Sequence, residues 1–185
     1  MLDIVKQTME FYFQKMRIPK IEELNIKRKE LTLTKWNCFV TLFINWEVRW
    51  ASWNVSEIKN SIAEELIENT VNALIWDSRF EKVNIWELKK IKIRVDLITN
   101  RKILARTDEQ AKKWEQTISR IDPVKKWIFV IKKDYEKLAI ILPNIDPKLI
   151  TGKDYQWILS AKLWEIFDEN KYIIYEIDTK VETDY

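Results

Sequence analysis

Glycine is nearly absent from this chain of 185 residues, which contains one glycine and ten tryptophans. An average chain of this length would contain about 13 glycines. Glycine adopts positive φ at little cost, and many tight turns require such angles. Asparagine can replace glycine in part, and this chain is rich in asparagine. The turns of the fold are therefore the places where the sequence is most constrained.

Several tryptophans occupy positions where a turn or a helix end is expected. Asn45-Trp46 joins two strand-like runs, at a place where Asn-Gly would be the strongest short hairpin signal. Trp76 follows a helical pattern, where glycine is favoured as the cap, and Trp127 opens another strand-like run. One interpretation is that the tryptophans fill the core or form a binding face.

The other interpretation is that most of these tryptophans are glycines in the living protein. Some bacterial lineages read the codon UGA as glycine, whereas a commonly applied alternative code reads it as tryptophan. We favour this interpretation because the glycine deficit matches the tryptophan surplus and the positions are turn-like. It predicts that several of five tryptophans are unusually exposed or adopt positive φ. These are Trp36, Trp46, Trp50, Trp53 and Trp127.

The composition excludes several classes of site. One cysteine and no histidine exclude an internal disulfide, a zinc finger, a histidine-based triad and a HExxH metalloprotease. A net charge of +3, from 32 basic and 29 acidic residues, is too balanced to favour nucleic acid as a partner. The apolar runs are far shorter than a membrane span, and no secretory signal opens the chain. We expect a cytoplasmic protein without a membrane segment, a metal-ligand cluster or a cofactor.

Hydrophobic periodicity predicts the elements of the first half of the chain. An amphipathic helix is expected over 2–16, and a solvated stretch of mixed charge over 17–35. A strand buried on both faces is expected over 38–44, with 47–51 returning beside it. Ser56 is expected to cap a helix that ends near residue 75.

The second half predicts further strands around a long loop. In a strand over 90–99, apolar residues alternate with Lys92, Arg94 and Asp96, so that one face should meet water. The remaining elements are expected as a loop over 100–126, strands over 128–131 and 138–142 with a turn at 135–136, a helix over 153–167 and a strand over 172–181. This order predicts an α+β fold with a largely antiparallel sheet flanked by helices, in one domain over 1–185.

With glycine written at the tryptophans, two adjacent stretches resemble the AMMECR domain family. That family has an R-G-x-F-V-T-L strand, then a short turn, then N-G-E-L-R-G-C-I-G. Here 35–42 reads K-W-N-C-F-V-T-L, and 45–53 reads N-W-E-V-R-W-A-S-W. Four tryptophans therefore fall on four glycines of the family.

Later stretches extend the resemblance over nearly the whole chain. The D-P-R-F element of the family is similar to D-S-R-F at 77–80, and its E-L-x-x-I-x-I-x-V strand is similar to the stretch that starts at Glu87. Its G-[LI]-x-V strand, L-L-P corner and K-A-G helix are matched at 127–130, 141–143 and 162–164. The arginine stretch together with D-x-R-F at this separation is a fairly specific combination.

The resemblance implies a two-lobed AMMECR-like domain whose biochemical activity is unsettled. Bacterial and archaeal members of the family are often encoded with a Memo-type protein and a radical SAM enzyme. The resemblance therefore implies these two proteins as partners. Our first hypothesis is that this domain works in that system and binds or processes a small anionic substrate near residues 49–53. Whether the protein is an enzyme stays open, and no catalytic residue is identified.

The stretch 49–53 is the leading candidate for a ligand site. With glycines it reads Arg-Gly-Ala-Ser-Gly, a loop whose backbone N–H groups could form an anion-binding concavity beside the helix expected from Ser56. An arginine can bind a carboxylate or phosphate bidentately. Ser52 offers a hydroxyl, but no histidine exists to activate it. The candidate ligand-binding residues are Arg49, Trp50, Ala51, Ser52 and Trp53.

Structural explanations of the same residues stay open. Glycines at 50 and 53 could only permit a tight corner, with Arg49 paired to an acidic neighbour. Asp77 and Arg79 are secondary site candidates, although they are better explained as helix caps that pair with each other. The acidic residues Glu64, Glu65 and Glu68 are expected to be solvated along their helix.

Two departures from the family pattern concern the candidate site. The family has cysteine where this chain has Ala51, and the proline of D-P-R-F is replaced by Ser78. The single cysteine, Cys38, belongs to the preceding strand and is expected in the core. Thiol chemistry at the site is therefore doubtful.

Two functions of other classes remain as alternatives. The first is a non-catalytic adaptor that presents a surface to its protein partners. The second is a single-stranded nucleic-acid binder, in which Trp46, Trp50 and Trp53 stack on bases beside Arg49. The weak net charge and the turn-like positions of the tryptophans argue against the second.

Overall fold

The computed structural model describes residues 1–53, 59–76, 81–105, 126–132, 135–142, 157, 160–161 and 172–185. The chain divides into two compact units, one formed by Met1–Ile98 with Lys180–Tyr185 and the other by Thr99–Thr179. Two long strands, β3 (Lys92–Ala105) and β6 (Tyr172–Thr183), contribute residues to both units. The expectation of one domain over 1–185 stays a prediction.

The first unit begins with α1 (Leu2–Lys15), which confirms the expected helix over 2–16. Its apolar stripe is buried through Ile4, Val5 and Met9. The helix ends at Met16, which adopts left-handed backbone (φ 53°) and donates its N–H to the carbonyl of Tyr12. The charged residues of 17–35 are exposed as expected, around η1 (Ile21–Glu23) and α2 (Glu30–Leu33).

The hairpin of β1 (Cys38–Ile44) and β2 (Glu47–Trp53) follows. The bounds of β1 agree with the expected strand, whereas β2 continues two residues beyond the expected end at Ala51. Both turn residues have positive φ, 53° at Asn45 and 68° at Trp46, as a type I′ hairpin requires. The two-residue hairpin is therefore confirmed, with tryptophan at a position that favours glycine.

The first unit carries the strand order β2-β1-β3-β6. β1 pairs antiparallel with β2 on one side and with β3 on the other. One face of β1 is sealed by Cys38, Val40 and Leu42, which belong to the core shared with α1 and α3. Phe39, on the opposite face, is also buried, so the first half of β1 is covered on both sides as expected.

The face of β3 that was expected to meet water is wet only in part. Lys92 is exposed, but Asp96 is only 3 % exposed. Residues two apart in a strand share one face, and Arg94 holds Asp96 through two hydrogen bonds of 2.8 Å. The prediction was wrong at Asp96 because a charge-matched partner allows a carboxylate to leave water.

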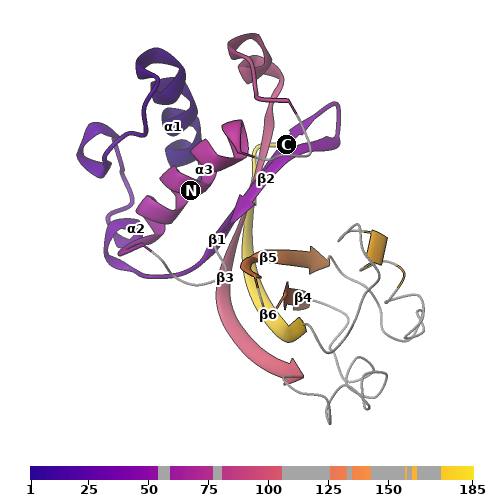
Figure 1. Cartoon of the computed structure of the whole chain (residues 1–185). Coiled ribbons are helices and arrows are strands. Elements are labelled where there is room, and N and C mark those ends of the chain that lie inside the picture. The colour runs from indigo at the N-terminus through magenta and orange to yellow at the C-terminus, as the bar shows by residue number, and fades with distance from the viewer. Residues whose placement is uncertain are drawn as a thin grey trace. The chain divides into compact units, whose positions relative to one another are not determined.

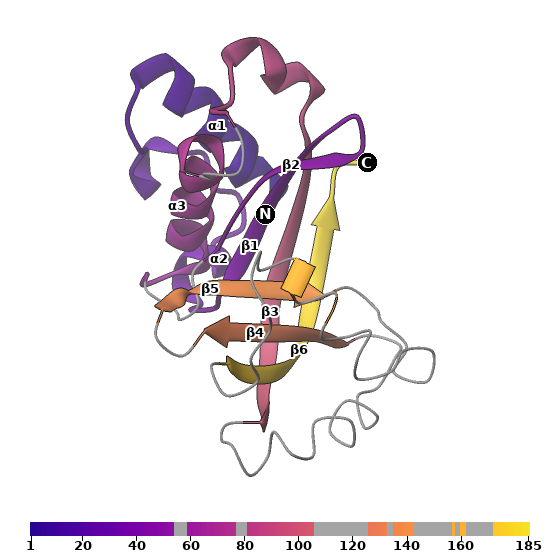
Figure 2. The same cartoon turned by 45° about the vertical axis from the view of Figure 1, so that its right-hand side comes forward.

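The helix α3 (Ile62–Ile75) starts later than expected. Its N-cap is Ser61, whose hydroxyl accepts a 3.2 Å hydrogen bond from the N–H of Glu64, whereas Ser56 lies outside the described residues. Ser61 is followed directly by Ile62, the first buried residue of the apolar stripe, which explains why this serine and not Ser56 marks the start. α3 packs on α1, β1 and β2, and Figures 1 and 2 show α1, α2 and α3 on the same side of the hairpin. The 3₁₀ helix η2 (Ile85–Lys90) then leads into β3.

The second unit is built on β4 (Lys126–Lys132) and β5 (Tyr135–Leu142), in the order β3-β6-β4-β5. β4 pairs antiparallel with both β5 and β6. Two expectations were wrong: β3 extends to Ala105 into the expected loop, and Tyr135 and Glu136 belong to β5 instead of a turn. Of the helix expected over 153–167, the described residues 157 and 160–161 are helical. The α+β class with a largely antiparallel sheet is confirmed.

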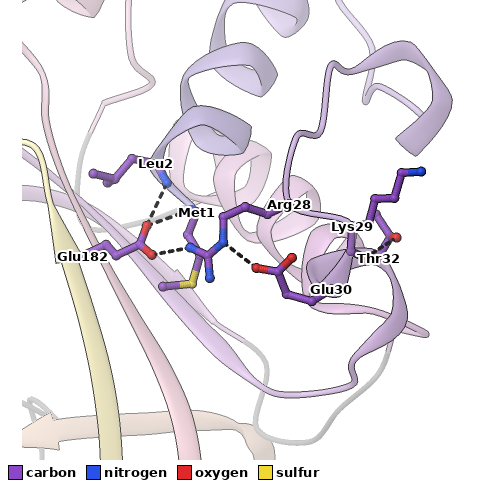
Figure 3. A network of polar contacts seen from close by, with 7 residues as sticks. All are labelled: Met1, Leu2, Arg28, Lys29, Glu30, Thr32 and Glu182. Atoms are coloured by element: carbon purple, nitrogen blue, oxygen red, sulfur yellow. Dashed lines mark hydrogen bonds and ion pairs between the residues drawn. The ribbon is translucent and has the colours of Figure 1, made fainter.

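A polar network joins the last strand to the start of the chain within the first unit (Figure 3). Glu182 of β6 accepts hydrogen bonds of 2.7 Å from the α-amino group of Met1 and from Arg28, and Arg28 also donates to Glu30 at 2.7 Å. Burial by itself would raise the pKa of Glu182, but the hydrogen bonds from Met1 and Arg28 lower it below its ordinary value. The ionised carboxylate therefore stabilises this contact. Among the described residues, no helix is both long and apolar enough to cross a membrane.

Candidate functional site

Residues 49–53 belong to β2 and are not a loop after it. Ser52 lies opposite Val40 of β1, and Trp53 lies opposite Phe39. The expected loop was therefore wrong for this stretch, whereas the assignment of an anion site to these residues stays a prediction. Strand pairing prevails because β1 continues to offer backbone partners as far as Phe39.

The pairing of β2 with β1 is irregular at Arg49. Leu42 lies opposite Trp50, but the next residue of β1, Phe43, lies opposite Val48. Arg49 is therefore an extra residue on β2, as in a β-bulge. Bulges bend the strand, re-aim a side chain and occur frequently next to active sites. The backbone geometry thus distinguishes Arg49 from the other residues of the candidate stretch.

β2 also lies at the edge of the described sheet. An edge strand directs a row of backbone N–H and C=O groups away from its neighbour. An edge can therefore supply the backbone donors that were expected from a glycine loop. The helix that was expected to begin just downstream, at Ser56, begins at Ile62.

Ala51 connects the candidate stretch with an ion pair on β3. It lies opposite Thr41 of β1, and Thr41 lies opposite Arg94 on its other side. Burial by itself would lower the pKa of Arg94, but its hydrogen bonds to Asp96 raise it above the ordinary value. Arg94 therefore supplies a fixed positive charge in the same row of the sheet, already matched by Asp96.

A buried polar set, which sequence reasoning missed, lies on the other face of β1. Glu65 of α3 is 1 % exposed, so the expectation that it is solvated was wrong. The side-chain amide of Asn69 donates to the carbonyl of Cys38 at 3.1 Å and to Glu65 at 3.5 Å. The sequence spacing indicates that both residues are buried. Glu65 and Asn69 are four residues apart, and they follow Ile62 and Leu66 by three residues each, which places them on the apolar face of the helix.

Cys38 is fully buried in the core, as expected. Burial raises the pKa of its thiol, with a further contribution from the nearby Glu65. A thiol that is buried and protonated is a poor nucleophile. Among the described residues, no group of three or more potential ligands of the His, Cys, Asp and Glu types could hold a metal ion.

Trp46, in the turn of the hairpin, is the tryptophan nearest the candidate stretch whose side chain is described. It is 72 % exposed, and its ring packs at right angles on Tyr185 with centroids 5.1 Å apart. Trp46 thus meets both expectations for a misread glycine, whereas Trp36 is half-buried and packs against the core. The side chains of Trp50, Trp53 and Trp127 lie outside the described part of the chain, so the aromatic ridge expected for nucleic acid stays a prediction.

The secondary candidates Asp77 and Arg79 lie outside the described residues, together with the rest of 77–80. The residue before them, Trp76, caps the end of α3 with φ −114° and ψ −4°. This conformation is open to any residue, so the helix end does not require glycine at 76.

Comparison with known proteins agrees with this architecture. The sequence matches the AMMECR1 family over residues 2–161. The fold is similar to the crystal structure of an uncharacterised protein from Pyrococcus horikoshii, with a TM-score of 0.69 and 17% identity over 96% of this chain and 86% of that one. No curated protein matches the sequence. Because the match spans most of the sequence, the chain belongs to the AMMECR1 family.

Proposed function

We propose that this protein binds a small anionic ligand at β2, around Arg49. The observation that carries the proposal is the bulge at Arg49 in an edge strand. A guanidinium binds a carboxylate or phosphate in a bidentate manner, and backbone N–H groups at a sheet edge can add hydrogen bonds. Neither requires a metal or a nucleophile. This chain therefore binds the anion, and any reaction on it is carried out by the proposed partner proteins.

We propose that the protein acts with a Memo-type protein and a radical SAM enzyme. Members of the AMMECR1 family, to which the chain belongs, are often encoded with these two proteins, and this supports the proposal. In such a system, this chain would bind the anionic group of a substrate on which the partners act. Co-purification of the tagged protein with both partners from the source cells supports this assignment, and recovery of neither contradicts it.

Calorimetry with inorganic phosphate tests the anion site. Phosphate is titrated into the unsubstituted protein and into Arg49→Ala, with Arg17→Ala as a matched control. Arg17 already pairs with Glu23 on an exposed segment, so its loss should leave affinity unchanged. We expect at least about tenfold weaker binding by Arg49→Ala, which is the loss of about 1.4 kcal/mol. Equal affinities of Arg49→Ala and the unsubstituted protein would contradict the site.

An adaptor role is the second candidate, and exposed aromatic residues favour it. Trp46, Trp76 and Trp86 are 72%, 74% and 82% exposed. Contiguous patches of large exposed apolar side chains are typical of surfaces that other proteins cover, whereas single exposed side chains are ordinary. If the protein is only an adaptor, a Trp86→Ala variant loses its partners in co-purification while phosphate has no effect. Steeply salt-dependent binding to single-stranded DNA would instead favour the nucleic-acid alternative.

We also propose that glycine replaces tryptophan at some of these positions in the source cells. The backbone at Trp46 supports this at one position, since its φ of 68° suits glycine and costs other residues about 1–2 kcal/mol. Mass spectrometry of the native peptide spanning residues 45–53 tests the proposal directly. Glycine at 46, 50 and 53 is the expected result, and tryptophan at these positions would overturn it.

A further inference from the structure

Glu65 breaks the pattern of its own helix. It lies on the face of α3 that packs on the core, between Ile62 and Leu66, and is 1 % exposed. A carboxylate loses its hydration there and is tolerated only where hydrogen bonds replace it. The partners of Glu65 therefore show what this glutamate connects.

Glu65 contacts the backbone on both sides of β2 in the sequence, directly at Lys59 and through Asn69 at Cys38. One carboxylate oxygen accepts a 2.9 Å hydrogen bond from the N–H of Lys59. The other accepts a long one, 3.5 Å, from Asn69, whose amide also donates to the carbonyl of Cys38 at 3.1 Å. Glu65 thus connects Lys59, where the chain enters the start of α3, with the first residue of β1.

Two further carboxylates of α3 hold the same segment. Glu64 accepts a 2.8 Å hydrogen bond from the N–H of Asn60, and Glu68 forms an ion pair with the ammonium group of Lys59. Three carboxylates of α3 therefore hold Lys59 and Asn60, which follow β2 in the sequence. At the other end, Trp53 pairs with Phe39, the neighbour of Cys38. The polar set thus contacts Lys59 and Asn60, which follow β2 in the sequence, and Cys38, which is next to the residue that pairs with Trp53.

We propose that Glu65 is a positioning residue for the anion site on β2. It fixes the return of the chain at Lys59 relative to the start of β1, and through them it holds the end of β2 in the geometry that binds the anion. This inference rests on the proposed function. It also assigns a role to Asn69, which transmits the contact from Glu65 to the backbone of β1.

The test removes the carboxylate and keeps the size of the side chain. Glu65→Leu leaves the N–H of Lys59 and the amide of Asn69 without this acceptor, so the melting temperature should fall, but binding is measured far below it, where the protein stays folded. Phosphate affinity should nevertheless fall at least about tenfold in calorimetry, because Lys59 loses its acceptor. Glu23→Gln is the matched control, since it removes an ion pair with Arg17 on an exposed segment and leaves the contacts of Lys59 intact. Its phosphate affinity should remain close to that of the unsubstituted protein.

A ligand-free measurement keeps the inference separate from the anion site. Hydrogen exchange at the Lys59 amide should become at least about tenfold faster in Glu65→Leu, while α1 amides keep their protection. Phosphate affinity and Lys59 exchange equal to those of the unsubstituted protein would overturn the positioning role. If Glu65→Leu fails to fold, Glu65→Gln serves instead, with an intermediate loss expected because only one of its terminal atoms can accept. Failure of the unsubstituted protein to bind phosphate would contradict the anion site itself, and Lys59 exchange would still decide whether Glu65 fixes the chain.

Discussion

The two strands of the β1–β2 hairpin are specified by different physics. β1 is an interior strand that packs on α3, and four of its apolar residues are buried, namely Cys38, Phe39, Val40 and Leu42. β2 is an edge strand, exposed at Glu47 and Val48 and irregular at Arg49. β1 contributes to the core. The backbone of β2 pairs with a strand on one side only, so its other side can bind a ligand. The difference predicts that substitutions in β1 affect stability and substitutions in β2 affect binding.

The largest expected effect is the loss of a core side chain from β1. Leu42 is fully buried, so Leu42→Ala should lower the free energy of unfolding by about 2–5 kcal/mol. The matched change in β2 is Val48→Ala, at a residue that is 44 % exposed, and it should change stability by less than about 0.5 kcal/mol. Urea denaturation of both variants measures the contrast. Equal losses would contradict the division between the two strands.

Loss of the cap of α3 should have a smaller effect. Ser61→Ala removes the acceptor for the N–H of Glu64 and should destabilise the protein by about 1 kcal/mol. Thermal unfolding measures this change, and Ser61→Asp, which keeps an acceptor, should restore most of the loss. An unchanged melting temperature in Ser61→Ala would show that the helix is capped elsewhere.

The turn between the strands offers a change in the stabilising direction. Trp46→Gly relieves a positive φ and should stabilise the protein by about 1 kcal/mol, even though the ring contact with Tyr185 is lost. Trp36→Gly is the matched control and should destabilise, because Trp36 packs against the core. A destabilised Trp46→Gly variant would argue that the ring of Trp46 has a structural role in the native protein.

Acid should weaken the contact that joins β6 to α1. The pKa of Glu182 is lowered from its ordinary value of 4.5, so its ionised form stabilises the fold above that pH. This contribution is lost as the pH falls through the lowered pKa of the folded state. Denaturation at a series of pH values below about 4.5 should show a shallower loss for Glu182→Gln than for the unsubstituted protein. Parallel curves would contradict the assignment.

Much of the first unit can be predicted from the sequence because its pattern is periodic. The ends of β1 and the extent of α1 follow from apolar spacing, and the hairpin follows from a two-residue gap between strand-like runs. The bulge at Arg49 cannot be predicted in this way, because it depends on which residues of β1 lie opposite β2. The later start of α3 was missed because Ser56 and Ser61 are both adequate caps in isolation.

The buried carboxylates show a second limit of sequence reasoning. Asp96 and Glu65 are polar residues that a periodic pattern assigns to water or leaves unexplained. Asp96 is buried because Arg94 matches its charge from the same face of the strand. Glu65 is buried because Lys59 and Asn69 provide donors from positions that folding brings together. Local spacing places Glu65 on the apolar face of α3, but it does not show that the N–H of Lys59 reaches its carboxylate.

The most direct test of the anion site is a phosphate titration followed by NMR at backbone amides. If β2 binds the anion, chemical shifts should change at the amides of residues 49–53, and Arg49→Ala should abolish these changes. The amides of α1 should stay unaffected in both proteins. Saturable shifts that lie outside β2, or that persist in Arg49→Ala, would contradict the assignment of the site to this strand.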